Sequence, residues 1–385
     1  MTDSLHSMLS TAWFCVLGLM LVFYVVTDGF DLGVGILSLL TRDVSERDQI
    51  AQSIGHVWDA NETWLVVLGG GLFGAFPAAY ATLLSDLYVP VMALIASLIL
   101  RGAAIEFRHA ATRKRFWDIV FGVGSLMAAL SQGVILGRVI TGLAPGALNA
   151  SFTAVTAIGV VSGYCLLGAT YLVKKTTGQL ERDARRFTLA SVSTTVCAAI
   201  VLSAGTMIFS PVGHDRWAES NVFHVLVLLA CIAIVAFAYI VLSVQTGSHR
   251  GPFRGAVTLF LVSFAGLAVS LFPDLVPGKL SIIDAASDNT TLVFMLFGIG
   301  TILPVMIGYN LYQYHVFRGK VGPDAHDETP APVRTPARVP TRTGGAVRGL
   351  AGTSNHATVV VGSGVRAAGS APSSARFATR QPSEH

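Results

Sequence analysis

Two pairs of carboxylates lie inside the first two membrane-length apolar stretches of this 385-residue chain. Asp28 and Asp31 form the first pair, and Asp59 and Glu62 form the second. A carboxylate near the centre of a bilayer costs about 2.5–3.5 kcal/mol on insertion scales. Such groups persist where they face a protein interior or an aqueous path, and proton relays are a common reason for keeping them. The four groups are therefore expected to face a protein interior or an aqueous path.

The composition is that of a polytopic membrane protein. The chain is 52% hydrophobic and 12% charged, whereas a soluble domain has about 25% charged residues. The net charge is +4, but the basic residues lie mainly in connections and in the C-terminal region. They therefore report membrane orientation, and no nucleic-acid partner is expected. The four cysteines lie in apolar segments without a Cys-x-x-Cys motif, so neither a disulfide framework nor a metal site is expected.

Hydropathy predicts an all-α protein with about nine transmembrane helices, because each span needs about 20 mostly apolar residues. The second span is the weakest, since its continuous apolar part begins near Trp64 and Pro77 separates it from the third. The nine predicted segments are 9–39, 54–76, 79–100, 116–140, 152–173, 187–209, 222–244, 256–272 and 290–314.

The chain divides by composition into a membrane domain, 1–320, and a tail, 321–385. The tail is rich in Pro, Ala, Thr, Gly, Ser and Arg and has no apolar period. Such a composition is typical of a disordered segment, and its basic residues favour the cytoplasmic side. We therefore predict a disordered basic cytoplasmic tail.

Charges in the connections predict the orientation. Lysines and arginines gather after the third, fifth, seventh and ninth segments, whereas the intervening connections have few. By the positive-inside rule the basic connections and the C-terminus are cytoplasmic. Nine spans then place the N-terminus outside, and eight spans would place it inside. Arg42 and Arg47 in the first connection favour nine, which puts both carboxylate pairs in the cytoplasmic half of the membrane.

The spacing of the carboxylates indicates a shared role. Residues three apart share a helix face, so Asp28 points with Asp31 and Asp59 points with Glu62. Because like charges repel, one member of each pair should hold a proton near neutral pH or have a cationic partner. A proton carrier needs such a group, although helix–helix hydrogen bonding is an alternative reason for these acids. Arg101 could pair with a carboxylate or extend to the membrane surface.

Nearby glycines, tryptophans and histidines add further expectations. Glycines at positions 29, 33, 35, 69, 70 and 71 permit close helix approach. Trp58 and Trp64 flank the second acidic pair and could lie against a cofactor of a partner, although packing is the ordinary role of such residues. His56, His224 and His315 lie near segment ends at spacings that do not suit one haem, so this chain is not expected to supply haem ligands.

The motifs at 27–35 and 58–65, the glycine-rich stretch that ends at Pro77, and the segments 100–108 and 283–287 resemble subunit II of the cytochrome bd-type quinol oxidases. The similarity in order and spacing extends from Met8 to about Arg318, and the compact length resembles the cyanide-insensitive branch. The resemblance implies nine helices, with two four-helix bundles and one peripheral helix, in the bacterial cytoplasmic membrane. It also implies a complex that reduces O2 to water with electrons from a quinol.

The resemblance further implies how roles divide between subunits. Haem b and haem d belong to the larger subunit I, on which this subunit packs, and a small single-helix accessory subunit and membrane lipid are further partners. Carried onto this chain, the proton path falls on Asp28 and Asp59. Asp31, Glu62 and Arg101 are expected to tune it electrostatically, and Trp58 is expected near a haem of the partner. Some relatives have glutamine at the position of Glu62.

Two other functions remain open from the residues alone. A proton-coupled secondary transporter would also need buried carboxylates, but such transporters usually contain internal repeats and interrupted helices, and no convincing repeat is found here. A purely structural subunit would use the acids only as packing contacts between helices.

Overall fold

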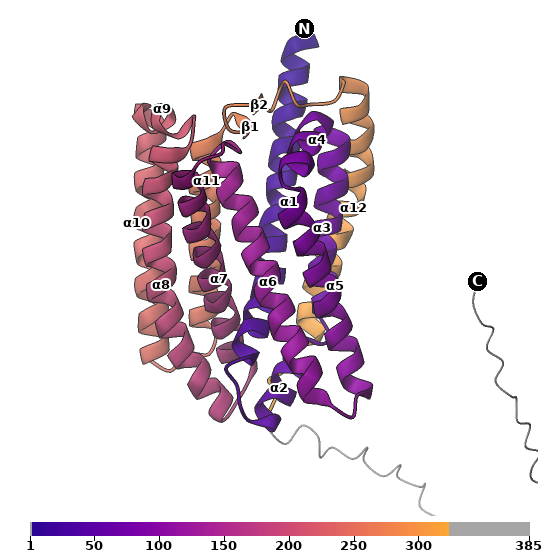
Figure 1. Cartoon of the computed structure of the whole chain (residues 1–385), viewed down its shortest axis with the longest axis vertical. Helices are drawn as coiled ribbons and strands as arrows, with labels where there is room; N and C mark the ends of the chain where they lie inside the picture. Colours follow the sequence, from indigo (N-terminus) through magenta and orange to yellow (C-terminus); the bar gives the residue numbers. More distant parts are fainter. Residues whose placement is uncertain (1, 323–385) are drawn as a thin grey trace, which may run out of the picture. The chain divides into compact units, whose positions relative to one another are not determined.

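The computed structural model describes residues 2–322, so the predicted tail from 323 onward lies outside the described residues. The described part is almost entirely helical, with one short antiparallel hairpin (Figure 1). The elements are α1 (Thr2–Ser38), α2 (Val44–Ile54), α3 (Trp58–Ala75), α4 (Pro77–Asp86), α5 (Tyr88–Ala110), α6 (Lys114–Ile140), α7 (Ala147–Lys175), α8 (Gln179–Phe209), α9 (Gly213–Ala218), α10 (Ser220–Gln245), α11 (Gly251–Leu271), β1 (Asp274–Val276), β2 (Leu280–Ser281) and α12 (Asn289–Val316).

The prediction of about nine membrane spans is confirmed for the described chain. Eight helices are long and apolar enough to cross a membrane, and α3 with α4 forms a ninth candidate that is bent by 119°. The weakness of the second predicted span has a local cause, since Asp59, Asn61 and Glu62 fall in the first turns of α3. At about 1.5 Å per residue, the 18 residues of α3 extend about 27 Å.

The third predicted segment, 79–100, is wrong in its boundaries. The structure divides it between α4 and α5, with a break at Leu87. Pro77 begins α4, where its missing N–H group costs no helical hydrogen bond. Beyond the break, α5 continues to Ala110, ten residues past the predicted end.

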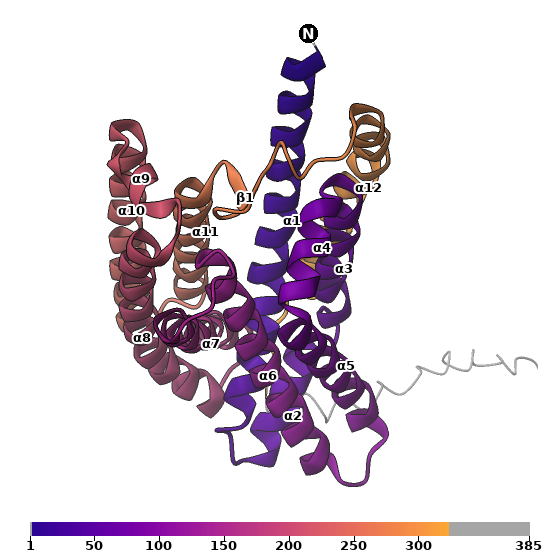
Figure 2. The same ribbon diagram turned by 45° about the horizontal axis from the view of Figure 1, so that its top comes forward.

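The long helices form two groups of four. Helices α1, α3, α5 and α6 form the first group, and α7, α8, α10 and α11 form the second (Figures 1 and 2). Helix α1 packs against both α6 and α7 and so joins the groups, while α12 packs against α1 and α3. This arrangement confirms the expected two bundles with one further helix.

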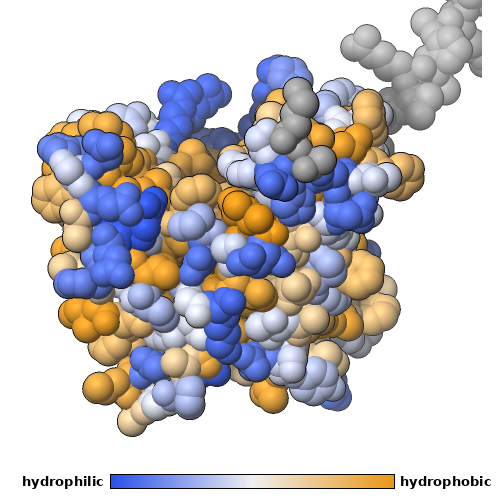
Figure 3. Space-filling model, turned by 90° about the horizontal axis from the view of Figure 1, so that it is seen from above, coloured by the Kyte–Doolittle hydropathy of each residue, from blue (hydrophilic) through white to orange (hydrophobic). Residues whose placement is uncertain are grey.

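Successive long helices run in opposite directions, so the connections gather at two ends. Helix α2 and the connections that follow α5, α7 and α10 lie at one end, and these are the segments rich in Lys and Arg (Figure 1). The hairpin and α9 lie at the other end. Seen in Figure 3, that face is a mixture of hydrophilic residues and apolar patches, as expected at a membrane–water interface.

An ionic network fixes α2 against the bundle. Arg108 on α5 bonds Asp118 on α6 at 2.5 Å and Asp48 on α2 at 2.7 Å, and Arg47 lies 3.2 Å from Asp118. Burial by itself would raise the pKa of Asp48, but the hydrogen bond and charge of Arg108, with the charge of Lys114, outweigh it and lower that pKa. The network therefore ties together the end of the molecule at which α3 begins.

Glycines bring α1 and α7 into backbone contact. A Cβ atom on Gly33 would lie 1.7 Å from the carbonyl oxygen of Tyr164, and one on Gly168 would lie 2.4 Å from the carbonyl carbon of Gly33. Only glycine fits at such a crossing. The expectation of close approach is therefore confirmed at Gly33, but within residues 2–322 it is wrong for Gly69 and Gly70 in α3, where an added Cβ atom would meet nothing within 4 Å.

Gly33→Ala is expected to destabilise the protein, because its methyl group would overlap the α7 backbone, which cannot move away as a flexible side chain could. Overpacking of this kind costs about 1–3 kcal/mol or more. Gly69→Ala is the matched control, since its methyl group meets no atom within 4 Å. The thermal midpoint of the purified protein in detergent checks this. Equal midpoints for the two variants would contradict the role given to Gly33.

Candidate functional site: a buried guanidinium–carboxylate cluster

Three helices of the first group contribute the predicted site residues. Asp28 and Asp31 lie one turn apart on α1, Glu62 lies in the second turn of α3, and Arg101 lies on α5. Asp28, Asp31 and Arg101 are fully buried. These positions all lie closer to the α2 end of their helices than to the hairpin end. The acids and the arginine thus come from distant parts of the sequence into one interior site.

Arg101 binds carboxylates from two different helices. Its Nη1 atom lies 2.5 Å from Oδ1 of Asp28, and its Nη2 atom lies 2.7 Å from Oε2 of Glu62. Of the two roles that the sequence left open, Arg101 therefore pairs with carboxylates and does not extend to the surface. The side chain of Glu62 is 25% exposed, whereas Asp28 is inaccessible. Charge-assisted bonds of this length are among the stronger contacts in proteins.

Asp31 is held by an amide instead of a cation. Asn61 donates from Nδ2 to Oδ2 of Asp31 at 2.8 Å, and its Oδ1 atom accepts from the phenol of Tyr314 at 2.7 Å. Asn61 is not singled out by the sequence analysis. Its position between two acids of the same motif was the available signal. Tyr314, on α12, gave no signal, because it is far away in the sequence.

A second series of hydrogen-bonded polar groups begins on α7 of the second group and continues through α6 to α1, near Asp28. Tyr164 on α7 donates to Oε1 of Gln132 at 2.5 Å, and Nε2 of Gln132 donates to the hydroxyl of Tyr24 at 2.8 Å. Tyr24 precedes Asp28 by one turn on α1 and interacts with it electrostatically. Sequence reasoning missed these three residues. Only the i, i+4 spacing of Tyr24 and Asp28 could have indicated one of them.

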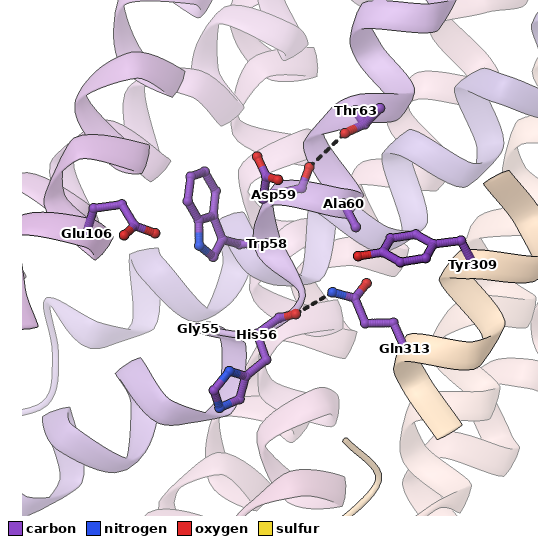
Figure 4. Close-up of a pocket in the computed structure, with 9 residues that line it drawn as sticks. All are labelled: Gly55, His56, Trp58, Asp59, Ala60, Thr63, Glu106, Tyr309 and Gln313. Carbon is purple, nitrogen blue, oxygen red and sulfur yellow. Dashed lines mark hydrogen bonds between the residues drawn. The ribbon is translucent and has the colours of Figure 1, made fainter. Parts of the chain in front are cut away.

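Asp59 lies apart from this cluster. It is exposed in the first turn of α3 and lines a half-open pocket of about 560 Å³. In Figure 4, Glu106 of α5 stands on one side of the pocket, and Tyr309 and Gln313 of α12 stand on the other. The full lining is Gly55, His56, Trp58, Asp59, Ala60, Thr63, Glu106, Tyr309 and Gln313.

Glu62 interacts both with Asp59, which lines the pocket, and with the buried Arg101. It follows Asp59 by three residues on α3, and the charge of Asp59 acts on it. Its partly exposed carboxylate is bonded on the inner side to Arg101. The four predicted carboxylates are therefore arranged by depth, with Asp59 exposed, Glu62 partly exposed, and Asp28 and Asp31 fully buried.

The two tryptophans have different surroundings. Trp64 is fully buried and stacks on Phe23 with ring centroids 4.5 Å apart, which is a packing role. Trp58 is half-buried, lines the pocket and lies over Gly102 of α5, where a Cβ atom would come within 3.1 Å of its ring. Trp58 therefore remains the tryptophan that another molecule in the pocket could contact.

Two of the histidines near the membrane segments make contacts within the protein. The ring of His56 stacks on Phe317 at 4.6 Å, and Nδ1 of His224 lies 2.5 Å from the carbonyl oxygen of Ser220. Within residues 2–322, no three His, Cys, Asp or Glu side chains are grouped to hold a metal ion.

Comparisons with known proteins agree with this architecture. The family model of cytochrome bd terminal oxidase subunit II matches residues 9–317. Cytochrome bd ubiquinol oxidase subunit 2 of Bacillus subtilis is 27% identical over 338 residues, which cover 83% of this chain and 97% of that protein. Cytochrome bd-I ubiquinol oxidase subunit 2 of Escherichia coli K12 is 25% identical over 366 residues, which cover 82% and 96%.

A solved structure has the same fold. The bd oxidase structure from Geobacillus thermodenitrificans superposes with a TM-score of 0.69 at 20% identity, covering 80% of this chain and 98% of the matched chain. The family match begins inside α1 and ends just after α12, so it takes in every site residue described above. The chain therefore belongs to the cytochrome bd terminal oxidase subunit II family.

Proposed function

We propose that this chain, as subunit II of a quinol oxidase in the bacterial cytoplasmic membrane, packs on a haem-bearing subunit I and contributes a proton path from the cytoplasm. The observation that carries the proposal is the buried Arg101, which binds Asp28 and Glu62 beside a pocket containing Asp59. A transporter is not favoured, because the family is that of an oxidase subunit. A structural role alone does not account for acids arranged from the pocket to the interior.

Haem b and haem d, bound by subunit I, would supply the electron transfer and oxygen chemistry, with quinol as the electron donor. The residues of this chain would bind and pass protons. Asp59 takes a proton in the pocket, and Glu62 forms the link to the interior. Asp28 is the fully buried end of the path. Trp58 lines the pocket beside Asp59, where a haem or side chain of the partner would contact it.

The charge balance of the cluster supports proton binding. Arg101 is the cation that interacts with Asp28, Asp31 and Glu62, so three ionised acids would leave an excess of two negative charges. In apolar surroundings such an excess is costly, and binding of protons offsets it. Asp31 and Glu62 then tune Asp28 through their charges, and Arg101 keeps one negative charge stable in the interior.

The basic connections support the orientation that we propose. They gather at the α2 end, nearest to the cluster and to the first turn of α3. With that end in the cytoplasm, the N-terminus lies outside and protons enter from inside the cell. Contacts with a single-helix accessory subunit and with membrane lipid remain predictions, as does the disordered tail. Within the described residues, Val321 still bonds the carbonyl of Lys175.

Asp59→Asn and Asp28→Asn are expected to lower oxygen reduction by the assembled complex at least tenfold, because a positioned proton-transfer group contributes about 10²–10⁴-fold. Turnover at saturating quinol, with haem content per complex measured alongside, checks this. Asp86→Asn is the control, since Asp86 pairs with Lys279 in an exposed contact at the hairpin end. Normal turnover in an assembled Asp59→Asn complex would exclude Asp59 from the path.

Arg101→Met is expected to destabilise the complex by about 3–5 kcal/mol, the cost of leaving a buried charge without its partner. Adding Asp28→Asn should recover part of the loss, because the unpaired charge is then removed. Thermal midpoints and the assembled fraction measure both effects. Arg186→Met is the control, since the exposed pair of Arg186 with Asp183 contributes little. An equal loss in both arginine variants would contradict the role of Arg101.

Orientation can be tested with single cysteines in a chain whose native cysteines are replaced. A membrane-impermeant maleimide is expected to label Lys279→Cys on the hairpin in intact spheroplasts. Ser248→Cys, in the connection after α10, should label only after permeabilisation. Both positions lie outside the long helices, Lys279 being exposed and Ser248 partly exposed. The reverse pattern would overturn the proposed orientation.

A further inference from the structure

We propose that Tyr24, Gln132 and Tyr164 are positioning residues that deliver a hydrogen-bond donor to Asp28 and thereby set how strongly this carboxylate holds a proton. The inference rests on the proposed function, because it takes Asp28 as a group of the proton path. It adds residues from α6 and α7, which contribute no acid to that path. Its basis is the direction of each hydrogen bond in the series Tyr164–Gln132–Tyr24.

The donors in this chain all point the same way. The phenol of Tyr164 donates to Oε1 of Gln132, because an amide oxygen can only accept. The amide nitrogen of Gln132 then donates to the hydroxyl oxygen of Tyr24. Tyr24 has thereby accepted one bond, and its own hydroxyl hydrogen remains to be donated. Hydrogen bonds arranged head to tail polarise one another, so the Tyr24 hydroxyl becomes a better donor.

Asp28 provides the matching acceptor. Its Oδ1 atom is bonded to Arg101, whereas its buried Oδ2 atom accepts no bond of good geometry from residues 2–322. Tyr24 precedes Asp28 by four residues on α1, and the two side chains interact. The carboxylate therefore lies between a guanidinium from α5 and a phenol on its own helix. Asp31 and Glu62 are the other charged groups that act on it.

Burial makes a packing role alone an inadequate account of these tyrosines. Tyr24 and Tyr164 are each 2% exposed. A buried hydroxyl is costly unless it is bonded, so phenylalanine would fill either position at lower cost. The glycine at position 29 also admits the phenol ring of Tyr164, since a Cβ atom there would lie 2.7 Å from that ring. The glycine on α1 thus leaves space for the Tyr164 ring, where the series of hydrogen bonds begins.

The amide of Gln132 can form a suitable hydrogen bond with Tyr24 in either protonation state of Asp28. As observed, its nitrogen faces Tyr24, which leaves the Tyr24 hydrogen for an ionised Asp28. When Asp28 is protonated, its own O–H group can donate to Tyr24. Rotation of the Gln132 amide by half a turn would then present the oxygen to Tyr24 and accept its hydrogen. Only the proton on Asp28 is gained or lost, and no covalent bond in the chain changes.

The same motif serves Asp31 independently. Tyr314 donates to the oxygen of Asn61, and the nitrogen of Asn61 donates to Asp31. In both cases a phenol polarises an amide whose N–H group faces the carboxylate side. Two such chains from different helices indicate that donor direction, and not only filled space, is maintained around the buried acids.

The test is an infrared pH titration of the intact complex, following the carboxyl C=O band that disappears in Asp28→Asn. Tyr24→Phe removes the donor to the ionised carboxylate, so the band should appear at higher pH. We expect the midpoint to rise by about one pH unit, which is a tenfold change in proton affinity. The alkaline limb of turnover should move in the same direction.

Gln132→Met should shift the midpoint in the same direction but less, because Tyr24 keeps its hydroxyl. Since Gln132 acts through Tyr24, the double variant should shift no further than Tyr24→Phe alone. Tyr171→Phe is the matched control on α7. Tyr171 is equally buried, at 3% exposed, and donates to the carbonyl oxygen of Ser53 at 2.8 Å. Its loss should leave the midpoint unchanged.

The outcomes separate this inference from the proposed function. An unchanged midpoint in Tyr24→Phe, with turnover lost in Asp28→Asn, would overturn the inference alone. Normal turnover in Asp28→Asn would overturn the proton-path role of Asp28, whatever Tyr24→Phe does. If the Tyr24 variant does not assemble, the Gln132→Met variant tests the inference instead. An unchanged titration midpoint in that variant would contradict the proposed series of hydrogen bonds. Additive shifts in the double variant would also contradict it.

Discussion

The rest of the site depends on the two bonds made by Arg101. One guanidinium reaches Asp28 on α1 and Glu62 on α3, so it fixes the interior faces of three helices. A guanidinium has donors for two carboxylates at once, and a lysine would not hold both in the same geometry. Without this cation the interior would contain acids with no counter-charge. The cluster is therefore a structural contact between three helices, and its cation stabilises the negative charge of the acids around it.

Around this cation, each buried acid has a different set of partners. Asp28 has a guanidinium and, as we propose, a phenol, whereas Asp31 has the amide of Asn61. Glu62 binds the cation, and its side chain is 25% exposed. These surroundings make the acids unequal, and a proton path needs groups that differ in affinity. In the proton path that we propose, this arrangement by depth would give the direction, from Asp59 inward.

The bundle contact between α1 and α7 connects the site to the second helix group. Gly33 and Gly168 allow the two backbones to touch, and the backbone of Tyr164 is part of this crossing. The chain through Gln132 can therefore reach Asp28 only because the helices approach so closely. The α2 network adds a second constraint at the end where α3 begins. Helix packing and the proton path that we propose would thus depend on the same few helix contacts.

Hydropathy along the sequence determined the helical class and the number of spans, because the length of an apolar run is a local property. The motifs around Asp28 and Asp59 likewise indicated the family and the acids. The break between α4 and α5 was missed, since it lies inside one apolar run. Only tertiary structure decided the contacts of Asn61, Gln132 and Tyr314, because the partners of each lie on other helices. Tyr314 and Asn61 are separated by 253 residues, and no local pattern records such a contact.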